Sequence, residues 1–235
     1  MLRLLLGTAL LPTAAVSLYV AARTLFDLAA NARTAAPFVA GALACGLARV
    51  FFDFRRSCLG AGMRRVYVFG HELTHALAAW GLGGKVYGME VGPDGGHVDL
   101  SHSNAFIALA PYCVPIYTVV VILAYRLLLW RDPAIERQEI YMFLLGSTFC
   151  FHLVFTFDSL WGNKQPDIEA GGGAVFSLAL IALANGLTAL LLLKALFPRS
   201  VYLMESFQRM AQLTVSFWRI PVQYAGSLAD QAMKK

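Results

Sequence analysis

Long apolar stretches recur along this chain, and they constrain its fold more than any other feature. Six of them approach the roughly 20 residues that an α-helix needs to cross a bilayer. Only 14% of the 235 residues are charged, whereas a soluble domain carries about a quarter. We therefore predict an all-α polytopic membrane protein with about six transmembrane helices, at residues 4–22, 36–52, 66–82, 105–130, 140–160 and 172–197.

Basic residues are shared unequally between the two sides that these helices define. The net charge of +5 is spread over short loops and the tail, so we expect a lipid bilayer as the partner and no nucleic acid. Cytoplasmic loops carry an excess of Lys and Arg, which predicts that both termini are cytoplasmic. That side would hold Arg3, Arg55, Arg56, Arg64, Arg65, Arg131, Arg137, Arg199, Arg209, Arg219, Lys234 and Lys235, and the other side Arg23, Arg33, Lys85 and Lys164.

Three segments need a separate interpretation. Residues 85–101 alternate in hydropathy around a Gly-Pro-Asp-Gly-Gly turn, which predicts a short β-hairpin after the third helix. Residues 200–235 mix apolar and polar residues as an amphipathic helix on the cytoplasmic membrane surface does, with a partner-binding helix as the alternative. The first apolar stretch has no clean cleavage site, so we interpret it as a retained helix and not as a signal peptide.

His71, Glu72 and His75 form a His-Glu-x-x-His pattern inside the third predicted helix. Two histidines four residues apart lie on one face of a helix and can bind one ion. In zinc enzymes with this pattern the glutamate is not a ligand but the base that takes a proton from water. A glutamate at membrane depth is costly without such a role. None of the four cysteines forms a C-x-x-C pair, so we interpret them as buried apolar residues.

A catalytic zinc site needs a third protein ligand. His97 and His102 lie in or after the predicted hairpin, and three further candidates lie in or just after the fifth helix. One of them, His152, sits near the middle of a span, where it could also orient a ligand or polarise a substrate. The other two are Asp158 and Asp167.

Residues 66–185 resemble the site-2 protease family of intramembrane zinc metalloproteases. His71, Glu72 and His75 match the first motif of that family, and LAPYCVP at residues 109–115 loosely resembles its middle Gly-Pro element. The third motif of the family is an Asn-x-x-Pro stretch leading to Leu-Asp-Gly, in which the aspartate is the third zinc ligand. This chain departs from that third motif.

The departure leaves two readings. In the first, FHLVFTFD carries His152 in place of the asparagine and Asp158 as the ligand, and depth favours it because Asp158 lies only about 12 Å along the helix from mid-membrane. In the second, QPDIEAGGG supplies Asp167, and residues 171–173 form a flexible helix start. The second reading requires residues 161–170 to fold back as a re-entrant segment that lines a cavity. We favour Asp167, then Asp158, then His152.

The resemblance implies an intramembrane zinc metalloprotease with one membrane domain at residues 1–199, a catalytic core at about 66–197, and a tail at 200–235. The substrate would be a transmembrane protein whose helix is locally unwound, and the hairpin could accept it by strand addition. Regulation would come from a membrane partner or from the spans themselves. The alternative is a catalytically silent, protease-like scaffold or partner-binding subunit. A transporter fits less well, because the chain has no inverted repeats.

Overall fold

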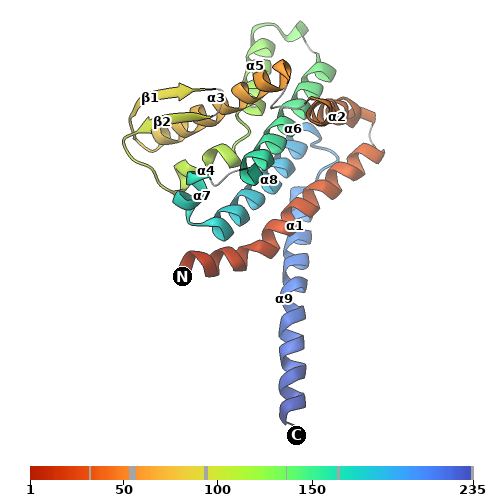
Figure 1. The fold of residues 1–235 in the computed structure, drawn as a ribbon. Helices are drawn as coiled ribbons and strands as arrows, with labels where there is room; N and C mark the ends of the chain where they lie inside the picture. Colours follow the sequence, from red (N-terminus) through yellow and green to blue (C-terminus); the bar gives the residue numbers. More distant parts are fainter. Residues whose placement is uncertain (32, 53–56, 93–94, 136, 163–164, 234–235) are drawn as a thin grey trace. The chain divides into compact units, whose positions relative to one another are not determined.

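The computed structural model describes residues 1–31, 33–52, 57–92, 95–135, 137–162 and 165–233, and these are mostly helical (Figure 1). A small antiparallel sheet of two strands is the only sheet within these ranges. The elements are α1 (Leu2–Asn31), η1 (Arg33–Ala35), α2 (Ala36–Phe51), α3 (Cys58–Gly81), β1 (Val86–Val91), β2 (Gly96–Leu100), α4 (Ala105–Cys113), α5 (Ile116–Arg131), η2 (Pro133–Ile135), α6 (Gln138–Gly162), α7 (Pro166–Gly171), α8 (Ala174–Leu196) and α9 (Leu203–Met233).

Several of these helices have the length and hydropathy of membrane spans. Within the described ranges four qualify, and a fifth does if the bent pair of α4 and α5 is one crossing. Large apolar side chains on them are exposed, as at Leu43, Leu123 and Leu191, which suits lipid better than water. The third predicted span, residues 66–82, corresponds to α3, which is not among the qualifying helices. The qualifying segments are Leu2–Ala30, Arg33–Phe51, Gln138–Trp161 and Ala174–Leu196.

The predicted fourth span is not one continuous helix, which corrects the expectation for residues 105–130. The chain breaks between α4 and α5, whose axes differ by 68°. Val114 is extended at the break, with φ −106° and ψ 112°. The ring of Pro115 disfavours a helical conformation in the preceding residue, and Pro115 has no N–H to continue the ladder. The break therefore follows from the Val-Pro step.

β1 and β2 come after α3 in the chain, and both strands lie against α3 (Figure 1). β1 and β2 pair antiparallel, with Met89 opposite Val98 and Val91 opposite Gly96. Asn104 then caps α4, because its side chain accepts a hydrogen bond from the Ile107 amide at 3.0 Å.

The described residues divide into two compact units. The first comprises Met1–Leu28 and Leu178–Lys235, and the second comprises Ala29–Ser177. The first unit has a small core of buried residues from α1, α8 and α9: Val20, Ala21, Leu190 and Met210. The second unit contains the hairpin, the His-Glu-x-x-His motif and every aspartate and histidine that the sequence nominated as a ligand.

Within the second unit, α2 and α6 pack closely through glycines. A Cβ added at Gly41 would overlap the Phe143 carbonyl, and one added at Gly146 would overlap the Phe38 carbonyl. Small residues of this kind let two membrane helices approach backbone to backbone. The interface ends in an ion pair, in which Arg49 Nε and Asp158 Oδ2 are 2.7 Å apart.

Some predicted features fall on residues outside the described ranges. They are two of the arginines predicted to be cytoplasmic, the centre of the hairpin turn, part of the expected re-entrant segment before Asp167, and the last two lysines. The residues concerned are Arg55, Arg56, Pro93, Asp94, Asn163, Lys164, Lys234 and Lys235.

Candidate metal centre

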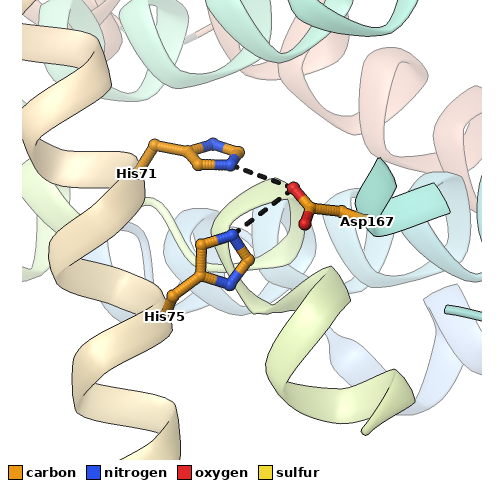
Figure 2. Close-up of side chains that lie close together, drawn as sticks. All are labelled: His71, His75 and Asp167. Atoms are coloured by element: carbon orange, nitrogen blue, oxygen red, sulfur yellow. Dashed lines mark hydrogen bonds and ion pairs between the residues drawn. The ribbon is translucent and has the colours of Figure 1, made fainter. Parts of the chain in front are cut away.

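α3 presents both histidines of the motif on one face. His71 and His75 lie one turn apart, and Figure 2 shows their rings directed at the same carboxylate. Their ring centroids are 4.9 Å apart. Only 10% of the His71 side chain and 7% of the His75 side chain are exposed. The helix therefore holds two imidazoles at a spacing from which both can reach one ion.

α7 brings Asp167 to these histidines. Pro166 begins α7 at a position where its missing N–H costs nothing. The Gln165 side-chain amide donates a hydrogen bond to the Ser159 carbonyl at 3.1 Å, which ties the start of α7 to the end of α6. The segment that was expected to fold back after the fifth predicted helix contains the short helix α7, which lies between α6 and α8 in the chain.

The turn from α7 into α8 depends on glycine. Gly172 and Gly173 have φ values of 130° and 91°, which side chains rarely tolerate. A Cβ at Gly171 would lie 2.6 Å from Leu109 Cδ2, so α7 packs directly on α4. The three consecutive glycines thus fix the position of the helix that carries Asp167.

One carboxylate oxygen is the focus of the site. Asp167 Oδ2 lies 3.3 Å from His71 Nε2 and 3.4 Å from His75 Nε2 (Figure 2). The Tyr112 hydroxyl donates a hydrogen bond to the same oxygen at 3.0 Å. Burial alone would raise the pKa of the Asp167 carboxyl, but the two histidines hold that pKa below its ordinary value, which keeps the group ionised.

The donor atoms fit a small divalent cation. One nitrogen from each histidine and a carboxylate oxygen of Asp167 all lie within 4.8 Å of one another. Ligands about 2.1 Å from a tetrahedral metal lie about 3.4 Å apart, which matches the distances from Oδ2 to the two Nε2 atoms.

A backbone carbonyl fixes the orientation of the His75 ring. His75 Nδ1 lies 2.9 Å from the Ile107 carbonyl, to which it must donate. A neutral His75 ring then points the Nε2 lone pair at a carboxylate oxygen, so two acceptors face each other unless a proton or a cation lies between them. A carbonyl that anchors the second ring nitrogen is typical of metal-binding histidines. The buried Nδ1 of His71 has no such partner within the described ranges.

The other nominated ligands make contacts outside the group of His71, His75 and Asp167. Asp158 makes two hydrogen bonds with Arg49, at 2.7 and 3.0 Å, and belongs to the α2–α6 interface. His97 pairs with Asp99 at 2.8 Å on the exposed hairpin.

The remaining two histidines also stand outside the group of three. His102 lies beside Ser101, with its Nδ1 3.2 Å from Oγ. His152 is buried on α6, and a supporting role for it stays a prediction. Among the described residues, Asp167 is therefore the only nominated third ligand that lies in one group with His71 and His75.

Glu72 borders a cavity of about 860 Å³ that also contains the three candidate ligands. Its side chain is not part of the ligand group, and the residue is only 7% exposed. β2 covers it closely, because a Cβ at Gly96 would lie 2.6 Å from Glu72 Cγ. A carboxylate is therefore held beside the candidate metal position without occupying it.

Two groups that form hydrogen bonds with the candidate ligands were not expected from the sequence. Tyr112 lies in the LAPYCVP stretch that suggested a Gly-Pro element, but its contact with Asp167 spans 55 residues and has no local signal. The Ile107 carbonyl is a backbone group, which no residue pattern identifies. Gly96, the last residue of the predicted turn, was the one available sign of close packing on α3.

Comparisons with protein-family models, with curated proteins and with solved structures found no match to this chain.

Proposed function

We propose that this protein is a membrane-embedded zinc metalloprotease. The observation that carries the proposal is the convergence of His71, His75 and Asp167 beside Glu72, a carboxylate that is not one of the three. Two imidazoles and one carboxylate suit zinc, which keeps an open fourth position at catalytic sites. The resemblance of the His-Glu-x-x-His motif to site-2 proteases supports the same chemistry.

Zinc held by these three residues would polarise the scissile carbonyl and acidify a water beside it. The Glu72 carboxylate accepts the proton of the attacking water and then passes it to the leaving amide nitrogen, so that Glu72 ends the cycle ionised. Tyr112 holds Asp167 in place through its hydroxyl hydrogen bond. β2 covers Glu72 and limits the access of bulk water to it.

The substrate in this proposal is an extended segment of a transmembrane protein. A helical substrate has its carbonyls committed to its own hydrogen bonds, so it must unwind before attack. The cavity lies among α3, β2 and the connection from α6 to α7, and it has room for an unwound peptide segment. Strand addition to the hairpin is one way to hold such a segment.

The proposed membrane placement follows from the charges. We infer that α3 enters the membrane as a sixth segment, with Arg64 and Arg65 near the cytoplasmic face. Both termini are then cytoplasmic, and the amphipathic α9 lies at that face.

Glu72→Gln tests the enzymatic role most sharply, because it removes the base and keeps the size of the side chain. The purified, zinc-loaded protein in detergent would be incubated with fluorogenic transmembrane peptides. We expect the wild type to cleave them and Glu72→Gln to be about a thousandfold slower, with unchanged zinc content.

Glu139→Gln is the matched control, because Glu139 is exposed in the first turn of α6. It should cleave at the wild-type rate. Equal cleavage by wild type and Glu72→Gln would refute the protease assignment, and no cleavage by wild type would favour the catalytically silent scaffold.

A further inference from the structure

The charged side chains that line the cavity are nearly all paired. Arg49 binds Asp158, and His97 binds Asp99. Asp167 faces the two motif histidines. Among the described lining residues, three remain outside these pairs: His102, which lies beside Ser101, the proposed base Glu72, and Arg64.

Arg64 is half-buried and lines the cavity, and within the described ranges no carboxylate lies within ion-pair distance of it. An arginine offers five N–H donors in a planar fork that matches a carboxylate. The guanidinium of Arg64 therefore presents donors on the cavity wall to which an anionic group could bind.

The position of Arg64 on α3 relates this site to the proposed metal centre. Residues 64, 68, 71 and 75 follow intervals of four, three and four, so Arg64, His71 and His75 share one face of the helix. Seven residues separate Arg64 from His71, which corresponds to about 10 Å along the axis. An extended peptide advances about 3.3 Å per residue, so this distance is about three residues of substrate.

We propose that Arg64 is a specificity-determining residue that binds an acidic side chain about three residues from the scissile bond. The inference rests on the proposed proteolytic function and adds the substrate class. In the membrane orientation proposed above, the acidic residue lies on the cytoplasmic side of the cleaved bond. Arg65 is adjacent in sequence but exposed, and it does not line the cavity.

The first experiment measures binding without catalysis. Glu72→Gln protein in nanodiscs of zwitterionic lipid would be titrated with fluorescent apolar nonapeptides that differ only in the position of one aspartate. We expect one register to bind about tenfold more tightly than its asparagine counterpart, the scale of one charge-assisted hydrogen bond. This preference should vanish in the double variant that adds Arg64→Gln and persist in the one that adds Arg65→Gln.

The second experiment maps the cleaved bonds. Zinc-loaded wild type should cleave peptide mixtures at bonds with Asp or Glu about three residues to one side. Arg64→Gln should lose this enrichment, Arg64→Glu should replace it with Lys or Arg, and Arg65→Gln should retain it. Zinc content, measured on each variant, serves as the control for folding.

Two results would overturn the inference. One is an acidic preference that survives in Arg64→Gln. The other is binding that ignores the peptide aspartate but rises with anionic lipid in the nanodisc, which would make Arg64 a lipid headgroup contact. A failure of the proposed function gives a different result from a failure of this inference. In that case the wild type cleaves none of the peptides, but the binding assay still shows whether Arg64 selects the aspartate.

Discussion

The Asp167 carboxylate lies 3.3 Å from the Nε2 atom of His71, although 96 residues separate the two in the chain. The contact depends on the short α7, which brings a carboxylate from beyond the end of α6 back to α3.

Tyr112→Phe should weaken zinc binding without abolishing it. The substitution removes the hydroxyl that donates to Asp167 Oδ2 at 3.0 Å. Loss of a hydrogen bond to a metal-binding carboxylate typically lowers affinity by tenfold or more, so we expect about a tenfold rise in the zinc dissociation constant. Competition titration with a chelator measures it. Tyr125→Phe is the control, because Tyr125 stacks on Tyr141 and does not line the cavity. Equal affinities for both variants would refute the orienting role of Tyr112.

Gly96→Ala should slow cleavage and leave zinc content unchanged. The added Cβ would meet Glu72 Cγ at 2.6 Å and Val68 Cγ1 at 2.7 Å, so either the strand or the carboxylate must move. Because Glu72 is not in the ligand group, the loss should appear in the turnover number alone. Gly95→Ala is the neighbouring control, since its Cβ meets nothing within 4 Å. A Gly96→Ala enzyme as fast as Gly95→Ala would contradict the close covering of Glu72 by β2.

Gly146→Ala should destabilise the protein by breaking the contact between α2 and α6. A Cβ there overlaps the Phe38 carbonyl, which is backbone and cannot rotate away. Overpacking of this kind typically costs about 1–3 kcal/mol, so the melting temperature in detergent should fall by several degrees. Gly46→Ala on α2 has open space around its Cβ and should melt at or above the wild-type temperature. Identical melting of the two variants would be inconsistent with the backbone contact.

Local patterns in the sequence predicted the parts of the structure that depend on interactions between residues close together in the chain. The spacing of His71 and His75 predicts a shared helical face, and hydropathy predicts most of the long helices. The turn residues after Lys85 predict the hairpin. Pro115 also carried a local signal, but the apolar run around it favoured one continuous span, and the backbone constraint imposed by proline prevailed.

Local patterns could not decide which residue is the third candidate ligand. Asp158 and Asp167 are nine residues apart, and each follows a motif-like stretch. The choice depends on where α6 ends, on the reversal of the chain before α8, and on the fact that Arg49 already binds Asp158. These are long-range relationships, as are the contacts of Tyr112 and of the Ile107 carbonyl, and no periodicity in the sequence encodes them.

The zinc content of two aspartate variants tests the central claim most directly. Asp167→Asn and Asp158→Asn make the same chemical change nine residues apart, once in the ligand group and once in the ion pair with Arg49. After purification and dialysis, metal analysis should find about one zinc per chain in the wild type and in Asp158→Asn, and far less in Asp167→Asn. Full zinc in Asp167→Asn, or its loss only in Asp158→Asn, would contradict the account.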